Sequence, residues 1–160
     1  MTWYSILVLI HVLGAIIWVG GILFIALVAV PSVRRMQSDV RMEFLNEIGR
    51  RFRNIGYVLL GILILTGVIQ AIHHGATIEN VLDGSFFQTT FGSRFGKKML
   101  FFISMLAVSI AHDFFLGPAT IRAARAGQDT EPLRKAASWL ARITGLLALG
   151  VVYYAVLMVR

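Results

Sequence analysis

Long apolar stretches, separated by short charged segments, make up most of this 160-residue chain. Each stretch is close to or above the roughly 18–20 residues that a helix needs to cross a ~30 Å hydrocarbon core. A cleavable signal peptide does not explain the first stretch, because such peptides place basic residues before a short apolar core, and no basic residue precedes Arg34. Four stretches have this character: Trp3–Val30, Ile55–Ile72, Met99–Leu116 and Ile143–Val159.

The pattern predicts an all-α integral membrane protein that forms an up-down four-helix bundle in one transmembrane domain over residues 1–160. Apolar residues at near-helical spacing in the charged segment 41–53 extend the second helix beyond its apolar part. No internal repeat is apparent. We expect helices at about 3–30, 43–72, 98–122 and 136–159, with a long external connection at 73–97.

The distribution of charged residues predicts how the chain is oriented in the membrane. Only 14% of the residues are charged, against roughly 25% in soluble domains. Eleven of the fifteen basic residues lie in segments 31–54 and 117–142, which the positive-inside rule assigns to the cytoplasm, with both termini outside the inner (plasma) membrane. The net charge of +7 therefore reflects topology and contact with the lipid bilayer, and nucleic acid is not an expected partner. The absence of cysteine excludes thiolate metal sites and disulfides.

The stretch LVLIHVLGAIIWVGG, residues 7–21, contains one ionisable side chain, that of His11. Ionisable residues at membrane depth are costly and usually face the interior of a helix bundle. Gly14, Trp18 and Gly21 follow His11 at helical spacing and share its face, so an imidazole, small residues and an apolar wall together would suit a haem. The alternative is a histidine that only forms a hydrogen bond to a serine, a threonine or a carbonyl group of another helix.

The third apolar stretch carries a second polar face, formed by Lys98, Met105 and His112 at intervals of seven residues. Lys98 lies near the outer surface, where a lysine can also simply extend to the headgroups. Adjacent helical residues point about 100° apart, so we expect Asp113 to pair with an arginine near the inner surface and not with His112. His74, at the outer end of the second helix, is a further candidate ligand.

Three segments resemble a known group of membrane proteins. HVLGAIIWVGGILF (residues 11–24) is similar to the first-helix signature of CopD-like proteins and of the related HemJ-type protoporphyrinogen oxidases. TTFGSRFGKKMLFFISMLAVSIAHDFFLGPA (residues 89–119) resembles the CopD pattern of a threonine, an aromatic–glycine pair, a lysine that opens the next helix and a proline that closes it. LARITGLLALGVVYYAVLMVR (residues 140–160) resembles the last helix of that group.

The resemblance implies roles for individual residues. His11 matches the first-helix histidine implicated in haem binding and activity in HemJ-type proteins, Lys98 matches their essential helix-opening lysine, and His112 falls near their third-helix histidine. CopD-like proteins are associated with copper uptake or resistance, and they usually carry an Asn-Arg pair where this chain has His112 and Asp113. The resemblance thus implies either haem-dependent oxidation or copper handling.

These observations favour a haem b protein that transfers electrons in the membrane or oxidises a porphyrin-like substrate. His11 and His112 differ by roughly 8 Å in depth at 1.5 Å per residue, so His74 or a second haem is an alternative to ligation by both histidines. Two other hypotheses stay open: a copper protein whose path is lined by His11, Met99, Met105 and His112, and a structural subunit of a larger complex. A homo-oligomer or a redox partner protein would fit the first hypothesis.

The sequence assigns candidate roles to eight residues. The predicted roles are Lys98 as catalytic residue; His11, His112, Gly14, Trp18, Met105 and Arg94 at the cofactor; and His11, His112 and His74 as metal ligands.

Overall fold

The structure is a computed structural model that describes residues 2–159, and every regular element in this range is a helix. Inside a lipid bilayer the backbone N–H and C=O groups have no water to bind, and a helix satisfies them within one segment. Four helical spans are long and apolar enough to cross a membrane, which confirms the predicted all-α membrane protein. These spans are Trp3–Ser32, Ser38–His73, Thr90–Arg125 and Glu131–Met158.

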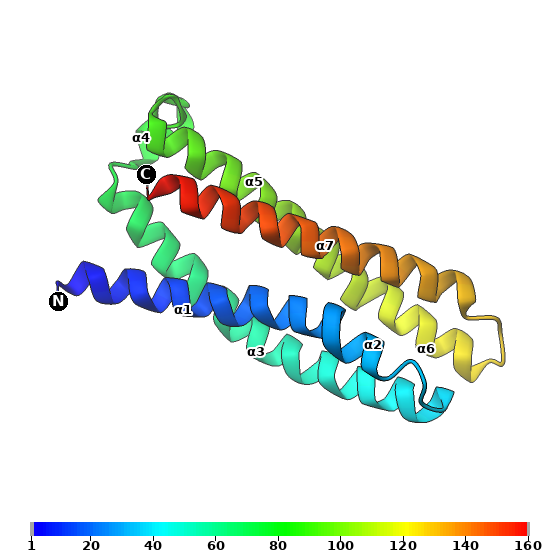
Figure 1. The fold of residues 1–160 in the computed structure, drawn as a ribbon. Coiled ribbons are helices and arrows are strands. Elements are labelled where there is room, and N and C mark those ends of the chain that lie inside the picture. Colours follow the sequence, from blue (N-terminus) through cyan, green and yellow to red (C-terminus); the bar gives the residue numbers. More distant parts are fainter. Residues whose placement is uncertain (1, 160) are drawn as a thin grey trace. The chain divides into compact units, whose positions relative to one another are not determined.

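The chain divides into two compact units, Met1–Asn80 and Val81–Arg160, and the single transmembrane domain expected from the sequence stays a prediction. In the first unit the two long helices α1 and α3 pack against each other (Figure 1). The short α4 follows them in sequence, across the division between the units. The elements are α1 (Trp3–Phe24), η1 (Ile25–Ala29), α2 (Val30–Ser32), α3 (Ser38–His73) and α4 (Ile78–Leu82).

The second unit is also built on a pair of long helices, α5 and α7, which lie side by side (Figure 1). A side chain at Gly150 of α7 would overlap the ring of Phe101 on α5, so the glycine permits this close approach. The predicted up-down bundle concerns the assembly of both units and stays a prediction. The elements are η2 (Ser85–Gln88), α5 (Thr90–Ala111), η3 (His112–Leu116), α6 (Gly117–Arg125) and α7 (Glu131–Met158).

Three of the long helices begin earlier than the sequence predicted. α3, α5 and α7 start at Ser38, Thr90 and Glu131, five to eight residues before the expected positions. The expectation followed the apolar residues, whereas the first turns of these helices are polar, and the side chain of Thr89 caps the start of α5. The predicted loop 73–97 therefore contains α4, η2 and the first two turns of α5.

Both units contain a π-helical turn shortly before a proline. In each case the N–H of the residue before the proline binds the carbonyl five residues earlier, that of Ile25 in η1 and that of His112 in η3. Pro31 and Pro118 cannot donate a backbone hydrogen bond, and a proline ring clashes with the carbonyl four residues before it. The wider π turn relieves this clash, and such turns frequently occur at functional sites.

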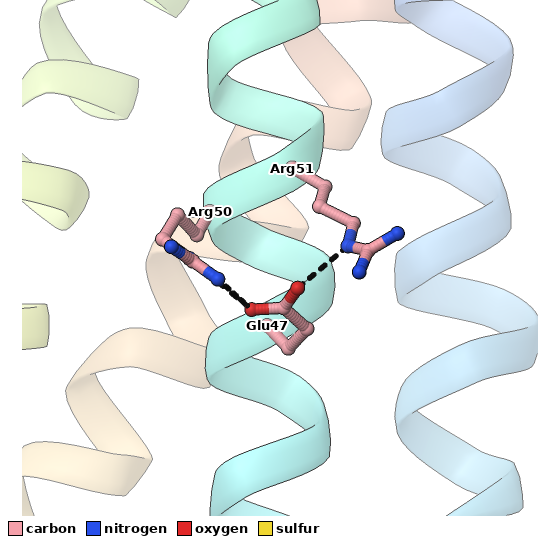
Figure 2. A network of polar contacts seen from close by, with 3 residues as sticks. All are labelled: Glu47, Arg50 and Arg51. Atoms are coloured by element: carbon pink, nitrogen blue, oxygen red, sulfur yellow. Dashed lines mark hydrogen bonds and ion pairs between the residues drawn. The ribbon is translucent and has the colours of Figure 1, made fainter.

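The first turns of α3 are charged and helical, as predicted for segment 41–53. Figure 2 shows Glu47 between two arginines of the same helix. One of its carboxylate oxygens accepts a hydrogen bond from Nε of Arg51 at 2.6 Å, and the other pairs with Arg50. These pairs are solvent-exposed and add little to stability. They leave α3 with a charged surface beyond its apolar part.

We expect Gly92→Ala to destabilise the second unit by about 1–3 kcal/mol. A methyl group at this position would overlap the carbonyl oxygen of Phe86 and lie 2.7 Å from its carbonyl carbon. The same carbonyl accepts the hydroxyl of Thr89 at 2.8 Å, so it cannot move without loss of the cap of α5. Thermal unfolding in detergent measures the effect.

Gly20→Ala is the matched control for this substitution. Nothing lies within 4 Å of a Cβ at Gly20, and alanine is favoured over glycine inside a helix by roughly 0.5–1 kcal/mol. Equal unfolding temperatures for Gly92→Ala and Gly20→Ala would contradict the structure around the start of α5.

Candidate functional site

His11 points toward α3 from the middle of α1, within the first unit. Its Nδ1 lies 2.7 Å from Oγ1 of Thr66, and this hydroxyl donates to the carbonyl oxygen of Ile62 at 2.6 Å. Because a hydroxyl has one proton, it must accept from the histidine, and Nδ1 of His11 therefore carries the ring proton. Nε2 then carries the lone pair. A histidine that ligates a metal usually has this arrangement, with its other nitrogen held by a neighbouring group.

The hydrogen bond confirms that His11 faces a neighbouring helix and not lipid. The sequence analysis gave such a hydrogen bond, to a serine, a threonine or a carbonyl group, as the alternative to a ligand role for His11. The two interpretations are compatible, because Thr66 engages Nδ1 and a metal ion would bind Nε2.

Small residues on both helices bring α1 and α3 into close contact around His11. The residues that meet are His11 and Gly67, Gly14 and Leu63, Trp18 and Gly56, and Gly21 and Phe52. Glycine commonly lets helix backbones approach each other in membranes. The face of α1 that the sequence offered to a flat haem thus contacts α3 at each of these positions. The roles of Gly14 and Trp18 at a cofactor stay predictions.

The expectation that Asp113 pairs with an arginine and not with His112 is wrong. Nδ1 of His112 lies 3.0 Å from Oδ1 of Asp113. Both residues open the π turn η3, which holds more residues per turn than an α-helix and so separates successive side chains by a smaller angle. A carboxylate that holds one ring nitrogen orients the other and raises its basicity toward a metal. His112 thus has the surroundings of a ligand, in the second unit.

The other predicted residues of the second unit lie along α5. Met105 is fully buried, and Lys98 is partly buried. Arg94 donates from Nη1 to the carbonyl oxygen of Leu157, in the last turn of α7, so it satisfies a carbonyl that the helix leaves without an internal partner. The predicted roles of these three residues at a cofactor or in catalysis stay predictions.

His74 lies at the end of α3, and its Nε2 is 3.0 Å from the hydroxyl of Tyr4 on α1. Within residues 2–159 no three His, Cys, Asp or Glu side chains gather into a metal site. His11 and His74 belong to the first unit, and Met105 and His112 to the second. Joint ligation by residues of both units therefore stays a prediction.

The sequence interpretation missed Thr66 and Tyr4. The spacing held a signal for Tyr4, once Thr66 is known to lie beside His11. Tyr4 and His11 are seven residues apart on α1, and Thr66 and His73 are seven residues apart on α3. Two antiparallel helices that place His11 beside Thr66 must also bring Tyr4 beside His73, two turns further along.

Known proteins match this chain over most of its length. The family model of CopD, copper resistance protein D, matches residues 46–158. An uncharacterized protein of Aquifex aeolicus (strain VF5) is 29% identical over 147 residues, which cover 91% of this chain and 88% of that protein. No solved structure matches. The resemblance to HemJ-type oxidases stays a prediction, whereas the resemblance to CopD is confirmed: the chain belongs to the CopD family of membrane proteins.

Proposed function

We propose that this protein binds copper inside the membrane and passes it across the bilayer, with Nε2 of His11 as a ligand. The supporting observation is the hydrogen bond to Thr66, which holds the ring and its tautomer in a membrane-spanning helix. Membership of a family described by copper resistance favours this metal. Copper is the cargo here and not a resident cofactor.

The chemistry of the other candidate residues supports copper as well. Imidazole nitrogen and thioether sulfur are both ligands that copper accepts, and α5 carries Met99 and Met105 ahead of His112 in η3. Asp113 would hold His112 as Thr66 holds His11. Haem b is the less favoured ligand because α3 contacts the face of α1 that a flat ring would need. A catalytic role for Lys98 belongs to that second hypothesis.

We further propose that both termini lie outside the cytoplasm and that the membrane is the plasma (inner) membrane, from the basic residues in 31–54 and 117–142. A cysteine introduced at Ser38 is expected to resist a membrane-impermeant thiol reagent in intact cells and to react once the cells are opened. A cysteine at Thr77, in the opposite connection, is the control and should react in intact cells. Labelling of Ser38→Cys from outside would refute this orientation.

We expect purified wild-type protein, loaded with Cu(I) in detergent, to retain copper and His11→Asn to lose at least one equivalent. Asparagine can still donate to Thr66 but has no nitrogen lone pair for the metal. Elemental analysis measures the copper, and Gly20→Ala is the control for a substitution in α1 that leaves the site intact. A folded wild type with a Soret band and no copper would replace this proposal by haem. A folded wild type with neither would indicate a structural subunit.

Thr66→Val is expected to weaken Cu(I) binding about 10- to 100-fold, because removal of the group that orients a ligating histidine typically has this effect. Thr66→Ser keeps the hydroxyl and should keep the affinity. Thr144→Val is the matched control, since Thr144 is equally buried and donates to Leu140 within its own helix. Competition with a chromophoric Cu(I) chelator measures the affinity, and equal affinities for Thr66→Val and Thr144→Val would contradict the assigned role.

A further inference from the structure

Four aromatic rings gather in the first unit where α1 begins and α3 ends. Tyr4 stacks on His73 with ring centroids 3.9 Å apart and planes at 23°. The hydroxyl of Tyr4 lies 3.0 Å from Nε2 of His74, and Trp3 meets His73 edge to face at 6.1 Å. We call Tyr4, His73 and His74 the end cluster. It combines two exposed imidazoles and a phenol that no other step of the proposed function uses.

The local sequence fixes the end cluster at this position. Gly75 adopts φ +89°, which ends α3 just after the two histidines. The N–H of Ala76 then binds the carbonyl of Ala71, and that of Gly75 binds the carbonyl of Ile72, a common way for a helix to end. Both histidines are thereby held in the last turn, beside the first turn of α1.

The two imidazoles lie at a spacing that one metal ion can bridge. The ring centroids of His73 and His74 are 5.8 Å apart. Two imidazole nitrogens that each lie about 2 Å from a shared ion place their ring centroids about 6 Å apart.

Tyr4 favours the form of His74 that binds a metal. When Nε2–H of His74 donates to the hydroxyl of Tyr4, Nδ1 carries the lone pair, and the phenol orients the ring as second residues do for metal-ligating histidines.

The end cluster lies on the same helix pair as His11. Tyr4 precedes His11 by seven residues on α1, and His73 follows Thr66 by seven residues on α3. At 1.5 Å per residue both intervals correspond to about 10 Å along the helices. A ligand released from the end cluster would thus meet His11 about two helical turns further into the membrane span.

We propose that His73 and His74 form a copper-acceptor site at the end of the α1–α3 pair, oriented by Tyr4, from which the ion moves to His11. The site extends the proposed function and rests on it. Its ligands are two imidazoles, which bind copper among several transition metals and do not suit an anion. Copper is the occupant because it is the cargo of the proposed function.

The test measures how many copper ions the full chain binds in detergent, and how tightly. Wild type is titrated with Cu(I) against a chromophoric chelator, in parallel with His11→Asn and the double variant His73→Gln/His74→Gln. We expect wild type to bind two ions, and each variant to lose a different one. Tyr4→Phe keeps the ring stacked on His73 but removes the hydroxyl, so it should keep both ions and weaken one of them about 10-fold. Glu79→Gln, an exposed acid in the next connection, controls for nonspecific attraction of cations.

A spectroscopic readout accompanies the titration. Electron paramagnetic resonance of the Cu(II)-loaded chain should show coupling to two nitrogen nuclei that disappears in the double variant and persists in His11→Asn. The single variants His73→Gln and His74→Gln replace the double variant if circular dichroism shows that it does not fold.

The outcomes separate the two proposals. If the double variant binds copper as wild type does while His11→Asn loses an ion, the end cluster only joins α1 to α3, and the proposed function stands. If no variant changes copper binding, both proposals fail. Tighter binding of Zn(II) than of either copper ion would overturn the assignment of the metal.

Discussion

A hydrogen bond between two short side chains inside a bilayer requires the helices that carry them to run almost in contact. His11 reaches the hydroxyl of Thr66 at 2.7 Å only because α1 and α3 approach closely there. Lipid provides no hydrophobic force that would press the helices together, so close packing and polar contacts must hold them. A glycine accordingly faces a large ring at two further levels, Gly56 against Trp18 and Gly21 against Phe52. A side chain at Gly21 would overlap the ring of Phe52, whereas one at Gly56 would lie in van der Waals contact with Trp18.

The four spans could be predicted from the sequence because lipid constrains them so strongly. Any segment that crosses the hydrocarbon must be apolar, long and internally hydrogen-bonded. These properties can be predicted from the sequence without knowledge of the tertiary structure. The inward orientation of His11 followed from the same argument, since a polar ring in lipid needs a partner. The identity of that partner did not follow. It depends on the register between two helices, and a single threonine in an apolar stretch gives no sign that it lies opposite a histidine.

In the second unit, prediction from the sequence failed for a different reason, which is the local geometry of the helix. The prediction for Asp113 assumed a regular α-helix through His112, where successive residues diverge by about 100°. The structure has a π turn at this point. Pro118 was visible in the sequence, but a proline does not by itself say how the preceding turn adapts. The early start of α5 was missed for a related reason: its first turn is capped by Thr89 and glycine-rich, not apolar.

The same succession of a long helix, a π turn, a proline and a second long helix occurs in both units. His11 precedes Pro31 by twenty residues, and Lys98 precedes Pro118 by the same number. The side chains differ at nearly every other position, which is why no repeat was apparent in the sequence. The backbone therefore repeats where the residues do not, and His11 and Lys98 occupy equivalent positions relative to the proline of their units.

The π turns have a consequence for sequence alignment. A π turn accommodates one residue more than an α turn without breaking the helix, so a relative that lacks the turn has one residue fewer between its equivalents of Lys98 and Pro118. An alignment then shows a one-residue gap inside a continuous membrane helix. Such a gap marks a change of backbone hydrogen bonding and not a broken helix. Residues of the relative that follow the gap must be renumbered by one before they are compared with the chain that has the π turn. Without this correction, a histidine equivalent to His112 is assigned to the wrong face of the helix.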